Sequence, residues 1–382
     1  MGETTERKLE HIETITKFGT DSSEGTLLDY VRILHRGLPN VDLNNVDLSK
    51  EFCGKTLRAP IMITGMTGGH PASEPINAAL AEVAEKYGLA IGVGSQRAGI
   101  EDPSLARTYS IVREKAPTAF VVANLGAAQL SKGYGVREAL RAVEMIKADA
   151  IAIHLNPGQE AYQDEGDPYF AGVLAKIEEL VDQLPVPVIV KEVGTGLSRE
   201  DIVLLSSVGV KCFDVAGLGG TSWIKVEAIR SAARHKGIPL KDPGPLSDHW
   251  GNPTAIAVIE AREAAPWAFI VGSGGVRSGL DAAKVISIGA DVAGLAAPAL
   301  RALAKGRESL QQFIDALLYQ LKTIIYMTGG TKVEDLWRSP VSIWGRLKDE
   351  LEARGLDVDR YLLKTRLETL LWRKRFAVRD TR

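Results

Sequence analysis

The amino-acid sequence predicts a closed (β/α)₈ barrel, and three observations support this fold class. Eight apolar runs of strand length follow one another from residue 61 onward, and most are separated by roughly 25–35 residues with a helical pattern. The runs are almost wholly apolar, as expected for parallel strands buried on both faces. Such a barrel takes about 250 residues as one domain, so a chain of 382 residues needs no second domain. The predicted strands are residues 61–64, 89–93, 120–124, 150–154, 188–191, 211–215, 269–271 and 291–295.

The segments between these runs predict the outer helices. Apolar residues recur with helical spacing over residues 75–87, 136–146, 169–184 and 279–288. Residues 1–60 then form an N-terminal extension, residues 61–330 the TIM barrel, and residues 331–382 a C-terminal helical extension. The basic segment 371–382 at the end of the chain is expected to be a solvated helix end, with a polyanion site as the alternative.

One connection is longer than the others. About 55 residues separate the sixth and seventh predicted strands, and they include the Pro- and Gly-rich stretch 237–253. We interpret this stretch as a long insertion that lies over the mouth of the barrel.

The composition excludes several classes of protein. The net charge of −2 gives no general attraction to nucleic acid or to an anionic membrane, so any anionic ligand must meet local positive charge. The two cysteines, Cys53 and Cys212, are too few and too far apart for a disulfide framework or a cysteine zinc site, which favours a cytoplasmic protein. Neither a secretory signal nor a run long enough to span a membrane is recognisable. Glycine is in excess, at 38 residues, and this excess needs a structural reason.

Polar and glycine residues follow every predicted strand, at the end where barrels of this type carry their active sites. After the seventh strand, Gly274 and Gly275 allow the backbone to approach a phosphate, and Arg277 adds charge. Thr221 follows two glycines in the preceding loop and offers a hydroxyl on the same side. The alternative for each loop alone is a tight turn without a ligand. One phosphate site together with Lys191 in the middle of the mouth fits flavin mononucleotide, because a cation stabilises the anionic reduced ring.

Two further clusters point to a second anionic ligand. His154, Asn156, Gln159 and Glu160 lie within seven residues at the end of the fourth strand, and a single carboxylate such as Glu160 suits Mg²⁺. The alternatives are an ion pair for Glu160 and a core histidine for His154. Near the N-terminus, three residues on a predicted helix could clamp a diphosphate or could simply be solvated, and these are Arg7, Lys8 and His11.

Taken together, these motifs closely resemble those of the type 2 isopentenyl-diphosphate delta-isomerases, over about residues 7–340. The most specific motifs are His154-x-Asn156-x-x-Gln159-Glu160 and Ser95-Gln96-Arg97, whereas the glycine loops are common to many flavin barrels. The others are Arg7-Lys8-x-x-His11, Met66-Thr67-Gly68-Gly69, Lys191-Glu192-Val193-Gly194, Gly219-Gly220-Thr221-Ser222-Trp223 and Gly274-Gly275-Val276-Arg277.

The resemblance implies reversible conversion of isopentenyl diphosphate to dimethylallyl diphosphate. It further implies FMN, Mg²⁺ at Glu160, NAD(P)H only as the reductant of the flavin, and a homo-oligomer such as a tetramer or octamer. The implied flavin contacts are Gly65, Met66, Thr67, Ser95, Asn124, Lys191, Thr221, Gly274, Gly275, Val276, Arg277, Ala296 and Ala297. The implied substrate contacts are Arg7, Lys8, His11, Ser95, Gln96, Arg97, His154, Asn156 and Gln159.

No ordinary acid–base pair is visible for the allylic shift, which must add one proton and remove another. Gln159 is an amide and is neither a useful acid nor a useful base, so our hypothesis is that reduced FMN itself shuttles the proton, through N5. Lys191 would then tune the charge of the ring, and Gln159 would position the alkene.

Two other readings remain open at this stage. An FMN-dependent oxidoreductase of the hydroxy-acid or dihydroorotate type shares the barrel and its phosphate loops, and His249 in the long insertion is its first candidate base. The second alternative is a barrel that binds a phosphorylated ligand but catalyses no reaction. The presence of Gln159, Glu160 and Lys191 argues against it.

Overall fold

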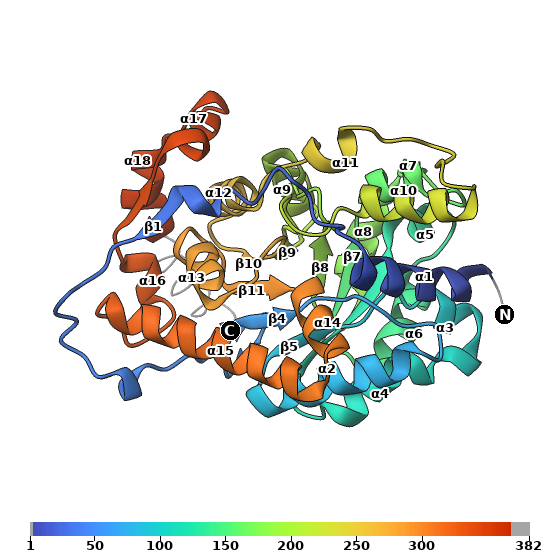
Figure 1. Ribbon diagram of the computed structural model, residues 1–382, viewed down its shortest axis with the longest axis horizontal. Helices are drawn as coiled ribbons and strands as arrows, with labels where there is room; N and C mark the ends of the chain where they lie inside the picture. Colours follow the sequence, from blue (N-terminus) through green and yellow to red (C-terminus); the bar gives the residue numbers. More distant parts are fainter. Residues whose placement is uncertain (1–2, 368–382) are drawn as a thin grey trace.

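Eight parallel strands close into a barrel in the computed structural model, which describes residues 3–367 (Figure 1). Their order around the barrel is β10-β11-β4-β5-β6-β7-β8-β9, so consecutive barrel strands are neighbours throughout. This arrangement confirms the predicted fold class. The strands are β4 (Ile61–Ile63), β5 (Ala90–Gly92), β6 (Phe120–Gly126), β7 (Ala150–His154), β8 (Val188–Lys191), β9 (Cys212–Asp214), β10 (Phe269–Gly272) and β11 (Val292–Leu295).

Side chains alternate between the two faces of these strands, and both faces are buried. On β9, Phe213 packs in the large core between barrel and helices, while Cys212 packs inside the barrel. The same alternation places Val190 of β8 outside and Ile189 inside. The near-continuous apolar runs of the sequence are therefore explained by burial on both sides.

Helices surround the barrel, and most begin and end at local sequence signals. Ser198 caps α9 and Ser278 caps α13, and each accepts a hydrogen bond from the backbone three residues later. The helices between β4 and the C-terminal extension are α2 (Ser73–Tyr87), α3 (Arg97–Glu101), α4 (Arg107–Lys115), α5 (Ala127–Ser131), α6 (Val136–Ile146), α7 (Pro157–Tyr162), α8 (Val173–Gln183), α9 (Arg199–Ser207), α10 (Trp223–Arg234), α11 (Leu246–His249), α12 (Thr254–Ala264), α13 (Gly279–Ser287), α14 (Ala297–Ala304) and α15 (Arg307–Met327). A short 3₁₀ turn, Pro103–Leu105, precedes α4.

One predicted helix begins later than the sequence pattern suggested. We expected a helix from residue 169, but α8 starts at Val173. Gly172 has φ 80°, which lies outside the right-handed helical region, so a helix cannot continue back through it. The apolar residues before it belong to a loop.

The N-terminal extension closes the lower end of the barrel with a hairpin that the sequence analysis did not predict. Strands β2 (Lys50–Phe52) and β3 (Lys55–Leu57) pair antiparallel, and Phe52 and Leu57 are fully buried inside the barrel. The ring of Phe52 lies edge-on to Phe120 and Phe269, with centroid distances of 5.5 and 5.8 Å. This apolar contact seals the end of the barrel that lies opposite the cavity described below.

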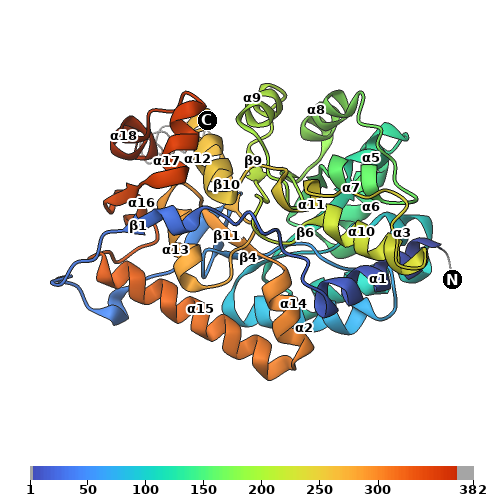
Figure 2. The ribbon, with the colours of Figure 1, turned by 45° about the horizontal axis from the view of Figure 1, so that its top comes forward.

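The two extensions meet each other. Strand β1 (Val31–Ile33) pairs antiparallel with β12 (Val341–Ile343), and Figure 2 shows β1 beside the C-terminal extension. The predicted C-terminal helical extension therefore also contains a strand, which pairs with a segment roughly 300 residues earlier in the chain. The remaining elements are α1 (Glu3–Lys17), the 3₁₀ turns Leu28–Tyr30 and Leu43–Asn45, α16 (Asp335–Arg338), α17 (Gly345–Ala353), α18 (Val358–Arg360) and a π-helical turn, Tyr361–Thr365. The basic segment 371–382 lies outside the described residues.

The long connection between β9 and β10 contains helices α10, α11 and α12. Its stretch 237–253 packs on the loops after β8 and β9, where Asn252 bonds to Thr195 and to Leu218. No residue of that stretch lines the cavity at the barrel mouth. The stretch therefore lies on loops at the mouth end of the barrel but not over the cavity, and α1, which packs against α10 and α14, covers the cavity instead (Figure 1).

Within residues 3–367, no helix is long and apolar enough to cross a membrane. The longest helix, α15, carries charged side chains along its length.

Candidate active site

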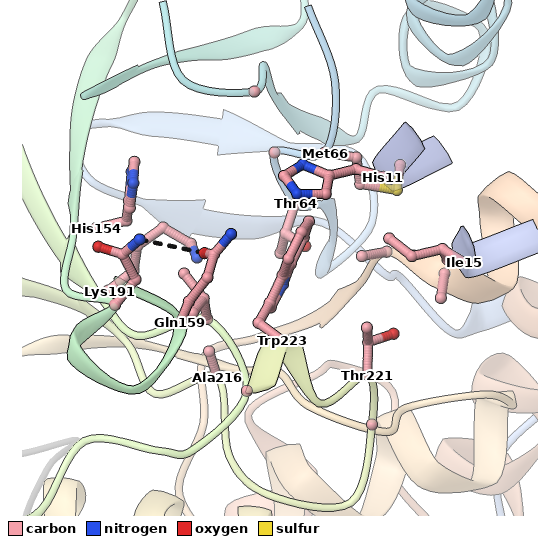
Figure 3. Close-up of a pocket in the computed structure, with 18 of the residues that line it drawn as sticks. His11, Ile15, Thr64, Met66, His154, Gln159, Lys191, Ala216, Thr221 and Trp223 are labelled. Carbon is pink, nitrogen blue, oxygen red and sulfur yellow. Dashed lines mark hydrogen bonds between the residues drawn. The ribbon is translucent and has the colours of Figure 1, made fainter. Parts of the chain in front are cut away.

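A cavity opens at the carboxyl ends of the barrel strands, under α1. Twenty of the predicted site residues line it, although they come from every part of the chain between residues 7 and 297. They are Arg7, Lys8, His11, Gly65, Met66, Ser95, Arg97, Asn124, His154, Asn156, Gln159, Glu160, Lys191, Thr221, Gly274, Gly275, Val276, Arg277, Ala296 and Ala297. Figure 3 shows His154, Lys191 and Gln159 on one side of this cavity and His11 and Ile15 on the other.

Two predicted site residues do not line the cavity. Gln96 is fully buried beneath it, where its amide donates to the carbonyl of Ala142 and accepts from the backbone N–H of Asn124. These two bonds hold Asn124 in place. The side chain of Gln96 therefore does not lie in the cavity, where the expected substrate contact would be. Thr67 is also buried, and its hydroxyl has no hydrogen-bond partner among the described residues.

The loops after β9 and β10 come together very closely at one end of the cavity. A Cβ on Gly220 would lie 2.5 Å from the backbone nitrogen of Gly275, and a Cβ on Gly274 would clash with the carbonyl of Gly217. Gly274 also has φ 101°, which side chains strongly disfavour. Only glycine fits where these loops meet, so the backbone of Gly220, Gly274 and Gly275 faces the cavity without side chains. We call this surface the glycine cradle, and it suits a phosphate, which binds backbone N–H groups.

Arg277 lies at the rim of this cradle but is already engaged. Its guanidinium donates to the carboxylate of Asp21 at 2.9 Å and to the carbonyls of Gly219 and Gly275. Arg301, from α14, donates to the same carboxylate. Asp21 therefore connects the N-terminal extension to both arginines, a role that nothing in the sequence pattern indicated.

A polar layer crosses the barrel directly below the cavity. Nδ1 of His154 lies 2.8 Å from the Asn124 carbonyl oxygen, and the Asn124 amide donates to the carbonyl of Val93. Burial first, and then the charges of Lys191 and Lys8, lower the pKa of His154 to about 3. His154 is therefore a neutral ring that donates from Nδ1 to Asn124 and keeps Nε2 as an acceptor.

Helix α1 brings its basic side chains to the opposite wall. Burial, followed by the charges of Arg7 and Arg97, lowers the pKa of Lys8 to about 7. Three cationic side chains thus face one region of the cavity and repel each other when it holds no anion. This arrangement is suited to an anionic ligand with more than one charge.

A buried carboxylate that the sequence analysis missed, Glu227 of α10, links α1 to α7. It accepts from His11 at 2.9 Å and from the amide of Gln159 at 2.8 Å, and it pairs with Arg230. Burial by itself would raise the pKa of Glu227, but His11, Arg230 and Gln159 lower it to about 2. Glu227 is therefore an anion that holds Gln159 in one orientation. No spacing signal identified its role in the site, because the two site residues that it contacts lie 68 and 216 residues away.

Helix α7 begins with Pro157, directly after Asn156, and this start places Gln159 and Glu160 on its first turn. The carboxylate of Glu160 accepts from the Asn156 amide at 2.9 Å and from the backbone N–H of Asp167 at 2.7 Å. It forms no ion pair within 4.0 Å with any residue of the described part of the chain. The side-chain oxygen Oδ1 of Asn156 is buried and has no hydrogen-bond partner among residues 3–367, so this oxygen and the remaining lone pairs of the Glu160 carboxylate are available to a ligand.

Trp223, at the start of α10, is another lining residue that received no role in the sequence analysis. Its ring meets that of His11 edge to face, with a centroid distance of 5.0 Å (Figure 3). It supplies an apolar surface beside Gln159, which suits a hydrocarbon group. His249, in contrast, lies on the surface and pairs with Glu24, so it cannot serve as the base of the alternative oxidoreductase.

The fold and a match to a family model together define the class of protein: a (β/α)₈ barrel enzyme of the FMN-dependent type. The sequence model of the FMN-dependent dehydrogenase family matches residues 158–343. A lactate oxidase structure from Pediococcus acidilactici is similar with a TM-score of 0.63, at 17% identity over 89% of this chain and 94% of the other. A mandelate oxidase structure is similar with a TM-score of 0.59, at 16% identity over 87% of this chain and 95% of the other. At these identities the likeness concerns the fold alone.

Whole-chain relatives identify the particular family. A protein from Aeropyrum pernix named isopentenyl-diphosphate delta-isomerase is 60% identical over 97% of this chain and 99% of its own length. One of the same name from Metallosphaera sedula is 46% identical over 93% of this chain and 97% of its own. The chain therefore belongs to the isopentenyl-diphosphate delta-isomerases, which confirms the resemblance recognised in the sequence.

Proposed function

We propose that this enzyme converts isopentenyl diphosphate reversibly to dimethylallyl diphosphate. The observation that carries the proposal is the division of one cavity into a cationic wall on α1, an apolar surface at Trp223, and a polar layer that contains Lys191. A diphosphate, a five-carbon chain and a flavin ring match these three regions in turn. Family membership supports the same substrate.

The residues fit FMN. The glycine cradle formed by Gly220, Gly274 and Gly275 suits its phosphate, and Ser95, Asn124 and Lys191 offer polar groups for the edge of the ring. Thr67 and the other flavin contacts expected from the sequence belong to the same proposal. When bound, reduced FMN supplies the acid–base chemistry of the allylic shift, for which the described residues offer no obvious pair.

At the other end, Arg7, Lys8, His11 and Arg97 hold the diphosphate in the proposed complex. Glu160 would hold Mg²⁺ beside the diphosphate, because this ion commonly takes one or two carboxylates and completes its shell with water and phosphate. No group of three acidic, histidine or cysteine ligands exists among residues 3–367, so the metal depends on the substrate for its remaining ligands.

Gln159 then positions the alkene. Its amide donates to Glu227, and its carbonyl oxygen accepts from Asn156 at 3.1 Å, so both ends of the carboxamide are fixed. Neutral His154 completes the wall as a hydrogen-bond acceptor at Nε2. Helix α1 and Trp223 exclude water from the hydrocarbon chain, which keeps a reactive carbon centre from being captured by water.

The decisive experiment measures isomerisation by the purified FMN enzyme under anaerobic conditions. We expect turnover only after reduction of the flavin by NADH, NADPH or dithionite, with no net consumption of reductant for each product formed. Stoichiometric consumption would support the oxidoreductase alternative. Chelation of divalent cations should abolish turnover, and Mg²⁺ should restore it.

A second experiment tests the placement of Lys191. The Lys191→Ala variant should release FMN or lose reduced-state activity, because the cation beside the ring is absent. Lys176→Ala, which removes an exposed lysine of α8, is the matched control. Unchanged flavin retention and rate in Lys191→Ala would show that the ring lies elsewhere.

The remaining parts of the proposal concern organisation. We propose a cytoplasmic homo-oligomer, a tetramer or octamer, in which residues 1–60 contribute substrate contacts, residues 61–330 bind FMN, and residues 331–382 form an extension. Light scattering after size-exclusion chromatography tests the oligomeric state, and deletion of residues 1–17 tests the contribution of α1 to the KM for the diphosphate.

A further inference from the structure

Lys191 has two neighbours on the adjoining strands that lie in register with it. His154 of β7 is paired with Lys191 on one side, and Asp214 of β9 is paired with it on the other. Because residues paired across parallel strands point to the same face, all three side chains point into the barrel. Lys191 thus lies between a neutral imidazole and a carboxyl group.

The ammonium group of Lys191 has few partners of its own. Its one hydrogen bond to a described residue is to the backbone carbonyl of Glu192, at 2.5 Å. The Glu192 carboxylate is taken up by the loop that follows it, since it accepts from the N–H groups of Val193, Gly194 and Thr195. Lys191 forms no ion pair within 4.0 Å with any residue from 3 to 367.

Asp214 is the other acidic side chain in this layer, and it is 1% exposed. Ser273 donates a hydrogen bond to its Oδ1, whereas its Oδ2 is buried and has no partner in the described part of the chain. The pKa of Asp214 is raised, chiefly by burial, while the charge of Lys191 and the hydrogen bond from Ser273 oppose this rise. The ionised form of Asp214 therefore depends on these two neighbours. Burying an acid with one unpaired oxygen costs free energy. This cost is explained if the charge of Asp214 acts on Lys191.

We propose that Asp214 is a positioning residue that acts as the counter-charge of Lys191 and limits the positive charge that Lys191 presents to the flavin. The inference rests on the proposed placement of Lys191 beside the flavin ring. Without Asp214, the full charge of a buried lysine would act on the ring. With Asp214, part of that charge is balanced within the barrel, and Ser273 keeps the carboxylate in place.

Sulfite binding measures how far Asp214 reduces the positive charge that Lys191 presents to the flavin, and the measurement requires no catalysis. Sulfite adds to N5 of oxidised FMN through its sulfur lone pair, and the adduct carries a negative charge that a nearby cation stabilises. The adduct bleaches the visible flavin absorption, so its dissociation constant is obtained by titration of the FMN enzyme. A change that only loosened the structure would not strengthen sulfite binding.

We expect Asp214→Asn to bind sulfite about tenfold to hundredfold more tightly, because a buried charge near Lys191 has been removed. Ser273→Ala should shift the constant in the same direction by a smaller factor, because it weakens the stabilisation of the carboxylate. Cys212→Ala, two residues deeper on the same strand, is the control and should leave it unchanged.

Lys191→Ala distinguishes the two levels of the proposal. Weaker sulfite binding in Lys191→Ala together with an unchanged constant in Asp214→Asn would overturn the role of Asp214 alone. An unchanged constant in Lys191→Ala would overturn the placement of the flavin and the inference with it. If Asp214→Asn retains no FMN, Ser273→Ala decides the question, and a wild-type constant in that variant overturns the proposal.

Discussion

The two ends of the barrel use the same eight strands but handle polar groups in opposite ways. At the lower end, the β2–β3 hairpin seals the interior with Phe52 and Leu57, and the buried Arg262 pairs with Asp291 at 2.8 Å. Within residues 3–367, polar atoms of Thr67, Asn156 and Asp214 at the mouth are buried without any partner, as are single atoms of Ser206 and Arg366 farther from it. The contrast fits the general division of (β/α)₈ barrels, in which the lower end provides stability and the upper end provides chemistry.

The two ends also differ in how completely the protein hydrogen-bonds a buried cation. Arg262 also donates to the carbonyls of Gly289, Pro266 and Ala268, so the guanidinium is well satisfied by the protein itself. Lys191, buried to a similar degree, has one described hydrogen bond. Polar groups at the mouth are held in place but keep unused donors and acceptors. These are available to hydrogen-bond the bound molecules.

The largest expected effect lies at the lower end and concerns stability. Asp291→Asn leaves Arg262 buried without its carboxylate, which should lower the free energy of unfolding by about 3–5 kcal/mol. Denaturant unfolding measures the change, and FMN affinity should stay at the wild-type value. Glu13→Gln, which breaks the exposed pair with Lys17, should cost at most about 1 kcal/mol. Equal losses in the two variants would remove the distinction between a buried and an exposed pair.

At the mouth, Glu227→Gln should reduce kcat/KM about 100-fold or more, because Gln159 and His11 lose the charge that orients them. Steady-state assays of the reduced enzyme provide the measurement. Glu101→Gln removes a half-exposed carboxylate at the rim, paired with Arg97, and should have an effect below about threefold. A rate in Glu227→Gln within threefold of wild type would contradict the role assigned to the carboxylate.

Gly274→Ala should weaken FMN binding about tenfold to hundredfold, because its Cβ meets the carbonyl of Gly217 and its φ of 101° disfavours a side chain. Fluorescence titration of the apoprotein with FMN measures the affinity. Gly133→Ala is a matched control, since Gly133 has the same φ of 101° but open space around it. If the two variants lose FMN affinity to the same extent, backbone strain and not the close approach of the loops is responsible.

The smallest effect concerns pH. Lys8 has a pKa near 7, so its positive charge is present below that pH and is lost above it. The affinity of the enzyme for an unreactive diphosphate should therefore fall by up to about tenfold for each pH unit above 7. Lys8→Met should remove this part of the profile, whereas Lys17→Met, at an exposed position of the same helix, should retain it. Parallel profiles for wild type and Lys8→Met would exclude titration of Lys8.

Much of the fold and of the site could be predicted because the signals are local. Near-continuous apolar runs located all eight strands to within two or three residues, and the order of βα units left few alternatives to a closed barrel. The motif from His154 to Glu160 is also local, since one strand end and one helix start carry it. Part of the glycine excess is explained by close contacts between the loops at the mouth, such as that of Gly220 with Gly275.

Tertiary structure decided the contacts between residues that are far apart in the chain. Glu227 lies 216 residues from His11, Asp21 lies 256 residues from Arg277, and Phe52 reaches the barrel interior from an extension without a barrel strand. The buried Gln96 belongs here too, because its motif indicated a site residue while its side chain points away from the cavity. Apolar periodicity reports which face of an element is buried, and hence the class of fold. Which side chains then meet depends on strand register and barrel closure, and only the folded chain sets these.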